Sequence, residues 1–328
     1  MTTETDDPLV SAIVTCYNQS QFVVETLESI KAQTYKATQL VIVDDCSSDD
    51  SVTTIERWLH ENRIDCTFIR HQKNQGICKT VNEALSLAAG KYISPIASDD
   101  IWLPDKIARQ VEIMESQPDN VGVIYSDAIQ IDEHGQTLPG LFIASHWNLP
   151  EMPQGCVLTS LLDGNFVVPM TTLIRKSCFD KVGVYDENLP WEDWDMWMRI
   201  ARHYSFLYSA LPFAKYRLHG KSYTASDPAR IARESCRVCL KQFRLGDLSV
   251  DQKSRLTSRL LSMSEDLYKN NDPEAGDILF ALWRATGHRR AAWMYRFSRW
   301  GISFENWQKA TSWRLSLLRR CGVIGGSA

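Results

Sequence analysis

The chain has 328 residues, of which 44% are hydrophobic and 23% are charged. This composition is typical of a folded globular protein of about two domains, and it excludes a collagen-like, coiled-coil or largely disordered chain. The net charge of −4 conceals an asymmetry. From Arg284 onward the chain carries nine basic side chains and one acid, Glu305, whereas the residues before Arg284 are acidic overall.

Strands and helices alternate over the first 130 residues, and each of the first four strand-like runs is followed by a helical pattern. These runs lie at residues 10–15, 40–43, 67–70, 92–97 and 121–131. We expect Ser48 to cap the second helix, Gly90 to end the third, and Pro104 to stand near the first turn of the fourth. Such alternation indicates right-handed βαβ units and an α/β fold with a parallel sheet.

The pattern changes after residue 131. Residues 132–165 are expected to form a mobile loop with a short helix, and strands return at 166–174 and 206–217. From Pro228 onward the periodicity is helical, with a break at 271–273. We therefore predict two domains, residues 1–222 and a helical C-terminal region of residues 223–328.

The start of the chain and its cysteines predict a cytoplasmic protein. Residues 1–8 are polar and acidic, so we expect no secretory signal, and no apolar run is long enough to span a membrane. Nine scattered cysteines are typical of reduced thiols. Cys236 and Cys239 form a Cys-x-x-Cys pair without the second pair that a tetrahedral zinc site needs, so no zinc is predicted.

Polar side chains follow four consecutive strands of the predicted sheet. These residues are Thr15, Tyr17, Asn18, Asp44, Asp45, Asn74, Gly76, Ser98, Asp99 and Asp100. Each of them alone could be turn or cap chemistry. Because ligands bind outside the carboxyl ends of parallel strands, their coincidence at one edge predicts a binding site.

The chain lacks the glycine-rich loops that usually hold nucleotides. Neither G-x-G-x-x-G nor G-x-x-x-x-G-K-[ST] occurs, so a dinucleotide-binding protein and a P-loop NTPase are not supported. The other way to hold a diphosphate is a divalent cation bound by carboxylates. Asp99 and Asp100, directly after a hydrophobic strand, fit the oxygen ligands that Mg²⁺ and Mn²⁺ prefer.

Five stretches, in this order and spacing, carry a resemblance to a known family. They are VSAIVTCYN at 10–18, VIVDDCSSDDS at 41–51, AGKYIS at 89–94, SDD at 98–100 and WEDWDMWMR at 191–199. Over about residues 9–222 the chain resembles a family 2 glycosyltransferase. The resemblance implies the GT-A fold, a Rossmann-like and mostly parallel sheet flanked by helices.

The resemblance also implies roles for the strand-end residues. Thr15 and Tyr17 would line a nucleobase pocket, Asp45 would bind the base, and Asp99 and Asp100 would form the DXD-type site for Mn²⁺ or Mg²⁺, with Asp100 as the direct ligand. Where family members often carry Ala-Arg-Asn, this chain has Cys78, Lys79 and Asn82. Asn74 and Lys79 are counted among the residues that bind the donor.

Family members of this kind transfer a sugar with inversion, which needs one carboxylate to take the acceptor proton. The resemblance assigns this role to Asp193 and a supporting contact to Glu192. A plainer alternative is that both acids simply face the positive end of a helix dipole.

The family also has a loop after the last strand that closes on the donor diphosphate. The matching residues here are Arg217, His219 and Ser222, and His219 could also bind the metal. The alternative is that these residues are simply a basic strand end.

The last part of the chain combines aromatic and basic residues. Trp293, Phe297, Trp300, Phe304 and Trp307 are expected to share one helical face, and seven arginines surround them: Arg289, Arg290, Arg296, Arg299, Arg314, Arg319 and Arg320. Such a helix can lie on an anionic membrane. Equally, the aromatics can pack on the catalytic domain or on a second subunit of a homo-oligomer. No nucleic-acid recognition motif is present, so nucleic acid is not expected as a partner.

The features and the resemblance together predict a cytoplasmic, metal-dependent glycosyltransferase. The resemblance implies that it is inverting, that its donor is UDP-linked and that its acceptor is a bacterial surface glycan on a lipid carrier; contact with the inner face of the membrane would be peripheral. The alternative is a non-catalytic module of the same fold that binds a nucleotide sugar or a glycan. A sugar nucleotidyltransferase would need a glycine-rich loop after the first strand, which residues 17–21 lack. A polysaccharide-extruding synthase is not expected either, because the Gln-x-x-Arg-Trp motif is absent.

Overall fold

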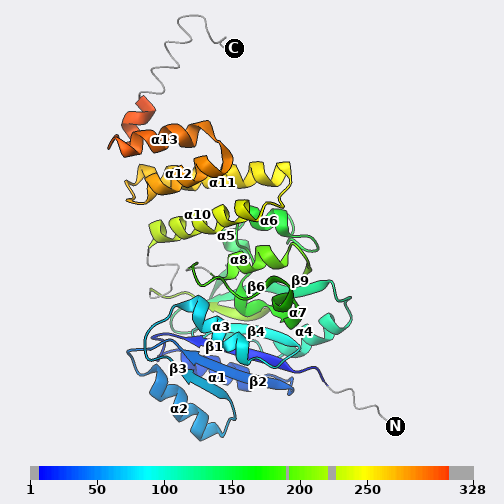
Figure 1. Ribbon diagram of the computed structural model, residues 1–328. Helices are drawn as coiled ribbons and strands as arrows, with labels where there is room; N and C mark the ends of the chain where they lie inside the picture. Colours follow the sequence, from blue (N-terminus) through cyan, green and yellow to red (C-terminus); the bar gives the residue numbers. More distant parts are fainter. Residues whose placement is uncertain (1–6, 190–191, 221–226, 310–328) are drawn as a thin grey trace, which may run out of the picture. The chain divides into compact units, whose positions relative to one another are not determined.

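The computed structural model describes residues 7–189, 192–220 and 227–309. The chain divides into two compact units, Met1–Ser222 and Tyr223–Ala328 (Figure 1). Each unit is described by itself below.

The first unit is built on a nine-stranded mixed sheet of order β3-β2-β1-β4-β8-β6-β9-β5, with β7 beside β6. Its strands are β1 (Val10–Cys16), β2 (Thr38–Asp44), β3 (Thr67–Arg70), β4 (Tyr92–Ala97), β5 (Ile101–Trp102), β6 (Val121–Ile131), β7 (Thr137–Leu141), β8 (Leu173–Arg175) and β9 (Ser205–Arg217). Strands β1 to β4 are parallel, as are β6 and β9, whereas β8 runs antiparallel to both β4 and β6. The predicted α/β fold with a mostly parallel sheet is confirmed.

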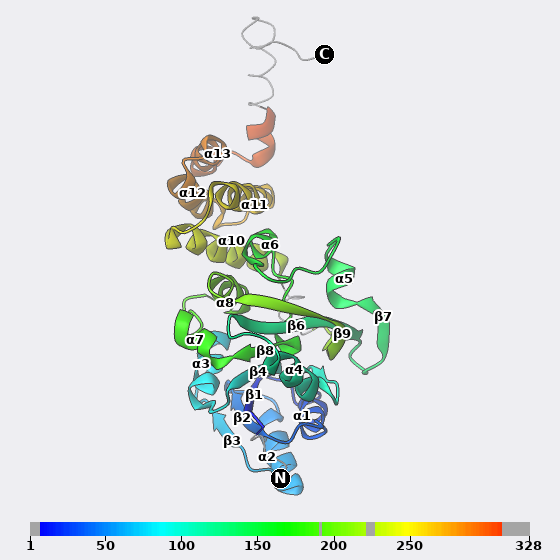
Figure 2. The ribbon, with the colours of Figure 1, turned by 90° about the vertical axis from the view of Figure 1, so that its right-hand side faces the viewer.

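Helices cover both faces of this sheet. They are α1 (Val23–Lys31), α2 (Ser51–Asn62), α3 (Ile77–Leu87), α4 (Lys106–Glu115), α5 (Phe142–His146), α6 (Leu158–Asp163), the 3₁₀ turn η1 (Pro169–Thr171), α7 (Lys176–Val182) and α8 (Glu192–Ile200). Helix α1 packs beside α2, while α3 packs on β1 and β2 from the other side (Figure 2). This follows from right-handed crossovers, because the chain steps outward from β1 to β3 and then returns to β4.

Two expected helix boundaries are wrong. Helix α2 begins at Ser51 with Asp50 at its N-cap, and Ser48 instead hydrogen-bonds the side chain of Asn18. Helix α3 ends at Leu87, so Gly90 is not its C′ residue. A Cβ on Gly90 would lie 2.6 Å from the backbone nitrogen of Ser11, which explains the glycine by close approach of two backbones.

The segment after β6 contains more regular structure than expected, because β7, α5 and α6 all fall within residues 132–165. The strand predicted at 166–174 is reduced to β8, because Pro169 opens the η1 turn and lacks the N–H that a strand ladder needs. Strand β5 was not predicted. Pro104 lies two residues before α4 and so stands near its first turn, as expected.

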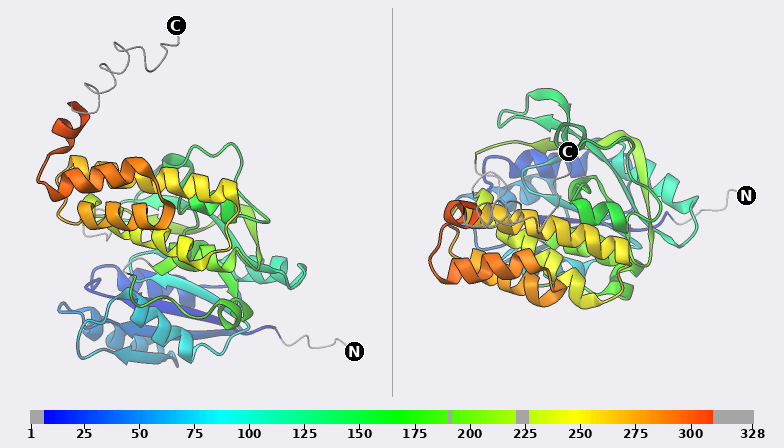
Figure 3. Two further views of the ribbon diagram at one scale, coloured as in Figure 1. Left: turned by 45° about the horizontal axis from the view of Figure 1, so that its top comes forward. Right: turned by 90° about the horizontal axis from the view of Figure 1, so that it is seen from above.

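The second unit is helical, as expected. Its helices are α10 (Pro228–Leu245), α11 (Val250–Lys269), α12 (Ala275–Thr286) and α13 (Arg289–Arg299), stacked in chain order (Figure 3). Asp227 caps α10 by accepting a hydrogen bond from the backbone N–H of Arg230, and Ser249 and Gln252 form a capping box on α11.

The two cysteines of the Cys-x-x-Cys pair, Cys236 and Cys239, are buried in α10, and burial raises the pKa of both thiols to about 12. Over the described ranges, none of the helices has the length and apolarity needed to cross a membrane.

The predicted aromatic face is divided into two parts. Helix α13 ends at Arg299, Gly301 has a φ of +69°, and residues 304–309 form a separate helical segment. Phe304 and Trp307 are buried, whereas Trp293 and Trp300 are exposed. The expectation of one continuous helical face is therefore wrong. Arg314, Arg319 and Arg320 lie outside the described residues.

Candidate active site

The candidate site residues that follow the first four strands lie at one edge of the sheet. They are held there because backbone hydrogen bonds between neighbouring strands continue one residue past the strand ends. The backbone N–H of Asp45 donates to Cys16 at 2.8 Å, that of His71 to Asp44 at 2.9 Å, and that of Ser98 to Thr15 at 3.1 Å. The first residue beyond each of β2, β3 and β4 is thus fixed to the neighbouring strand. Tyr17 follows β1 with 49% of its surface exposed.

The loops after β1 and β2 are tied together by short polar side chains. Asn18 adopts a left-handed φ of 55°, and its side-chain oxygen accepts from the backbone of Ser48 at 2.7 Å. The hydroxyl of Ser47 accepts from the backbone N–H of Asn18 and donates to the buried carboxylate of Asp44. Asp44 therefore helps to fix these two loops, and Tyr17 precedes Asn18 with its ring accessible.

Asp99, Asp100 and His219 come together although His219 lies 120 positions beyond Asp99 in the chain. Nε2 of His219 is 2.9 Å from Oδ2 of Asp99, and the same oxygen accepts from Nε2 of Gln19 at 3.3 Å. Oδ1 of Asp100 accepts from the backbone N–H of Arg217 at 3.0 Å. The end of β9 thus fixes the acidic pair that follows β4.

The electrostatics of this pair favour a cation. Burial, followed by the neighbouring charge of Asp99, raises the pKa of Asp100 well above its ordinary value. The hydroxyl of Ser98 and the side-chain oxygen of Gln19 are buried without a hydrogen-bond partner among the described residues. Carboxylates and unpaired oxygens are donors that suit Mn²⁺ or Mg²⁺, and the imidazole of His219 lies beside them.

The ligand set is not a complete protein cage. Within the described part of the chain, no three His, Cys, Asp or Glu side chains converge so as to hold a metal ion by themselves. Mg²⁺ in enzymes is commonly held by one or two carboxylates together with water and the phosphates of the substrate. The pair Asp99 and Asp100 fits that open type of site.

Arg217 is fully buried, and its guanidinium contacts other residues of the chain. Its Nε donates to the carbonyl of Asp99 at 2.8 Å, and one terminal nitrogen lies 2.6 Å from Oε2 of Glu25. The guanidinium also lies over the ring of Phe22, 4.7 Å from its centroid. The structure thus gives Arg217 a visible role in holding Asp99 and Asp100, and its binding of a phosphate stays a prediction.

Asp45 is almost completely buried in a network that the sequence did not suggest. Its Oδ1 lies 2.6 Å from Nδ1 of His71, and the backbone N–H groups of Gln75 and Gly76 donate to its two oxygens at 2.7 and 2.8 Å. Nε2 of His71 lies 2.6 Å from Glu83. Burial disfavours the charged imidazole, but the hydrogen bonds to Asp45 and Glu83 outweigh it and raise the pKa of His71.

Two more donor-binding candidates lie near this network. The side-chain amide of Asn74 donates to the carbonyl of Asp45 at 3.3 Å, and Lys79 is exposed in the first turn of α3. Ser222 and the side chain of Glu192 lie outside the described residues.

Asp193, the candidate base, stands in the first turn of α8 and is largely buried. Its Oδ2 accepts from the side-chain amide of Asn165 at 2.9 Å, and its Oδ1 accepts from the backbone N–H of Trp194 at 2.6 Å. The indole N–H of Trp194 donates to the carbonyl of Leu161 at 2.8 Å. Helix α6 and the segment that follows it therefore orient the start of α8.

Four residues that contact the predicted ones were not singled out from the sequence as site residues: Gln19, Glu25, His71 and Asn165. His71 directly follows β3, so the strand-end rule could have found it. Gln19 lies two residues beyond Tyr17 and could have been found in the same way. Nothing in the sequence indicates that Glu25 pairs with Arg217, which lies 192 positions further along the chain.

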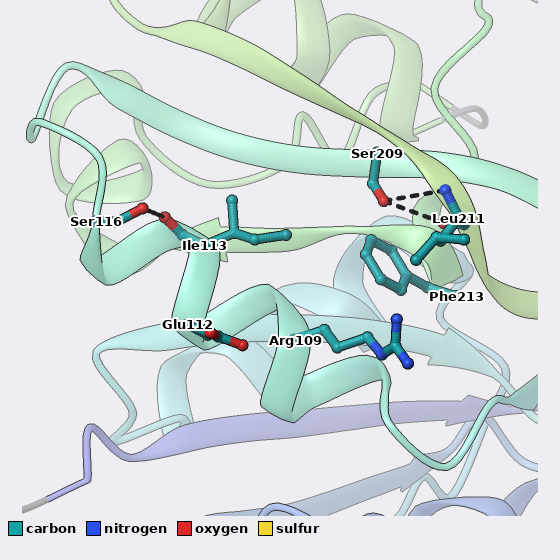
Figure 4. A pocket seen from close by; sticks show the side chains of 7 residues that line it. All are labelled: Arg109, Glu112, Ile113, Ser116, Ser209, Leu211 and Phe213. Carbon is teal, nitrogen blue, oxygen red and sulfur yellow. Dashed lines mark hydrogen bonds between the residues drawn. The ribbon is translucent and has the colours of Figure 1, made fainter.

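A pocket of about 360 Å³ lies elsewhere in the first unit, between α4 and the middle of β9 (Figure 4). Its walls include Ile113 from α4 and Leu211 and Phe213 from β9. None of the predicted site residues lines it, so the strand-end edge remains the candidate active site.

A family model identifies the class of protein that this fold and site define. The model for "Glycosyl transferase family 2" matches residues 11–183. The chain belongs to this family.

Individual relatives and solved structures agree with this assignment. An uncharacterized glycosyltransferase of Rickettsia felis is 28% identical over 81% of this chain, which spans only 43% of that relative's length. The Escherichia coli UDP-Glc:alpha-D-GlcNAc-diphosphoundecaprenol beta-1,3-glucosyltransferase WfaP is 29% identical over 69% of this chain and 84% of its own. The mannosyltransferase PcManGT of Pyrobaculum calidifontis, solved with GDP-Man and Mn²⁺, has a TM-score of 0.62 and 20% identity over 88% of this chain and 78% of its own. The last similarity shows the GT-A fold.

Proposed function

We propose that this chain transfers a single sugar, a hexose or an N-acetylhexosamine, from a UDP-linked donor to a glycan hydroxyl, with inversion. The observation that carries the proposal is the junction of Asp99, Asp100 and His219 at the carboxyl edge of the parallel strands. The name of the E. coli relative supports a UDP donor and an acceptor sugar on a diphosphoundecaprenol carrier. We extend the proposal to the assembly of a bacterial surface polysaccharide. Residues 1–222 form the catalytic domain in this proposal, and the enzyme works at the cytoplasmic side.

Asp100, Asp99 and His219 would hold Mn²⁺ or Mg²⁺ together with the donor diphosphate. A cation bound there offsets the negative charge that develops on the leaving diphosphate. Arg217 supports this site by fixing the carbonyl of Asp99 and the carboxylate of Asp100. Ser222 would contact the same diphosphate.

The nucleobase would lie against the exposed ring of Tyr17 and Thr15. Oδ2 of Asp45 accepts from Gly76 and retains acceptor capacity for an N–H of the base, because each carboxylate oxygen can accept about two hydrogen bonds. Asn74 and Lys79 complete the donor side of the pocket.

Asp193 would act as the general base. The acceptor oxygen attacks the anomeric carbon and forms the new glycosidic bond while its proton passes to the Asp193 carboxylate. The bond from the anomeric carbon to the diphosphate oxygen breaks, and UDP leaves with the electron pair. Glu192 would support the acceptor, and Asn165 keeps the Asp193 carboxylate oriented.

The test separates donor binding from transfer. Thermal shift with UDP-sugars and Mn²⁺ should raise the melting temperature of the wild type, and Asp100→Ala should remove the Mn²⁺-dependent part of that shift. Asp193→Asn should bind the donor normally but lose transfer by at least about 10²-fold. Asp105→Asn and Asp180→Asn, which change exposed carboxylates on the same unit, are the matched controls.

A non-catalytic module makes different predictions. It would show the same donor-dependent shift but would release no UDP with any glycan acceptor, and Asp193→Asn would then have no transfer to lose. Full transfer by Asp193→Asn would refute the assignment of the base, and an unchanged Mn²⁺ effect in Asp100→Ala would refute the metal site.

A further inference from the structure

Helices α12 and α13 leave large aromatic side chains exposed, while their buried faces are made of aliphatic residues and one methionine. On α13 the buried residues are Ala291, Ala292 and Met294, whereas Trp293 is 41% exposed and Trp300, at the C-cap, is 69% exposed. This is the reverse of a helix that uses its aromatic residues to fill a core. Large exposed apolar surface of this kind marks an interaction site.

Six aromatic residues of this region form two clusters, which together we call the aromatic face. Phe280, Trp283 and Tyr295 make one cluster, and Trp293, Phe297 and Trp300 make the other; Phe280, Trp293 and Trp300 are exposed, and the other three are partly exposed. Ring centroids of neighbours within it lie 5.0 to 6.3 Å apart. The guanidinium of Arg296 lies 5.2 Å from the ring centroid of Trp293 and 6.0 Å from that of Trp283, and so connects the two clusters.

The aromatic face is accompanied by positive charge. Arg284, Arg289, Arg296 and Arg299 are exposed and make no ion pair with any residue in the described ranges. Arg290 differs, because its Nε lies 2.7 Å from Glu265 and its guanidinium covers the buried Trp307. Over residues 275–309 the only acids are Asp277 and Glu305, and Glu305 pairs with Lys309.

We propose that the aromatic face and its four unpaired arginines bind the surface of an anionic lipid bilayer. Trp and Tyr favour the membrane–water interface, and arginines beside them attract anionic headgroups. A second copy of the chain is a poorer occupant, since an isologous contact would place the four arginines of one copy against those of the other. Single-stranded nucleic acid also stacks on aromatic side chains, and the test below distinguishes it from a bilayer.

This inference goes beyond the proposed transfer, and its test does not depend on transfer activity. The full chain is sedimented with vesicles of phosphatidylcholine mixed with phosphatidylglycerol, and with vesicles of phosphatidylcholine alone. We expect binding to the mixed vesicles that weakens with salt and is at least about tenfold weaker without the anionic lipid.

Two variants test the aromatic and the charged contributions to membrane binding separately. Trp293→Ser/Trp300→Ser removes two of the three exposed rings, and Arg289→Gln/Arg299→Gln removes charge while keeping the rings. Each should weaken binding to mixed vesicles at least about tenfold. Val250→Ser changes a side chain that is 87% exposed on α11 of the same unit and should bind as the wild type does. Circular dichroism and transfer to a water-soluble acceptor should be unchanged in all three.

Several results would overturn the proposal: no sedimentation with mixed vesicles, equal binding to both vesicle types, or wild-type binding by the tryptophan variant. A self-association that the tryptophan variant abolishes, in the absence of lipid binding, would assign the face to a second copy instead. Preferential binding of single-stranded RNA or DNA over vesicles would assign it to nucleic acid.

Discussion

The side-chain amide of Asn165 donates a hydrogen bond of 2.9 Å to Oδ2 of Asp193, the carboxylate proposed as general base. With Oδ1 taken by the backbone N–H of Trp194, the carboxylate cannot rotate freely. A base held in this way meets the acceptor in one orientation, which is the geometric requirement of general base catalysis.

Asn165→Ala should therefore lower kcat by about 10- to 100-fold while the KM for the donor stays within about twofold. Among the described residues the amide hydrogen-bonds only the Asp193 carboxylate, so we expect donor binding to be unchanged. Steady-state kinetics with varied donor and saturating acceptor measure both quantities. Asn188→Ala, an exposed asparagine between α7 and α8, is the control; an equal loss of kcat there would contradict the positioning role.

Arg217→Met should lower the free energy of unfolding by about 3 kcal/mol or more. The substitution leaves the carbonyl of Asp99 and the carboxylate of Glu25 without their partner, while the methionine fills much of the buried space. Urea unfolding followed by circular dichroism gives the value. Arg109→Met removes an exposed arginine paired with Asp105 and should cost less than about 1 kcal/mol.

His71 should make the stability of the first unit depend on pH. Its pKa in the folded protein is raised above the unfolded value of about 6.5, so protonation of His71 stabilises the fold. That contribution is complete below about pH 6.5 and is lost as the pH rises through the folded pKa. Unfolding free energies measured between about pH 6 and 9 should fall less steeply in His71→Gln than in the wild type.

The control for this pH effect is His134→Gln, which removes a histidine that is exposed in the loop after β6. Its profile should follow that of the wild type. If His71→Gln and the wild type show parallel profiles, the bridge between Asp45 and Glu83 does not bind a proton more tightly in the folded state.

Gly90→Ala should destabilise the first unit by about 2 kcal/mol or more. The new methyl group would lie 2.6 to 2.8 Å from backbone atoms of Ser11, Tyr92 and Leu9, none of which can move without disturbing β1 and β4. Gly220→Ala has nothing within 4 Å of its Cβ and should change the melting temperature little. Equal melting temperatures for the two variants would contradict the close-approach explanation.

Much of the first half of the fold follows from local patterns. The strands at Thr67–Arg70 and Tyr92–Ala97 have the predicted bounds, because each is a short β-rich run between turn residues. Strands β1 to β4 run parallel, so the residues that follow them, among them Asp45, His71 and Asp99, lie at the same edge of the sheet. The strand-end rule predicts this without knowledge of contacts between distant side chains.

The remaining features depend on contacts that are distant in the sequence. Strand β8 has only three residues and lies between β4 and β6, and no periodicity can be read from so short a run. The pairing of Glu25 with Arg217 spans 192 positions. In the C-terminal unit the spacing of the aromatics is helical throughout, but Gly301 in a left-handed conformation ends the helix and sends Phe304 and Trp307 into a core.

Asp99 and Asp100 are held by residues from both ends of the first unit, and this has a consequence for folding during synthesis. Glu25 lies in the first helix, Asp99 and Asp100 follow the fourth strand, and Arg217 and His219 come last. A nascent chain that has already formed β1 to β4 still lacks the backbone and imidazole partners of its carboxylates. If this junction binds the donor as proposed, donor binding can arise only after residue 219 has left the ribosome, when nearly the whole first unit is already available to fold.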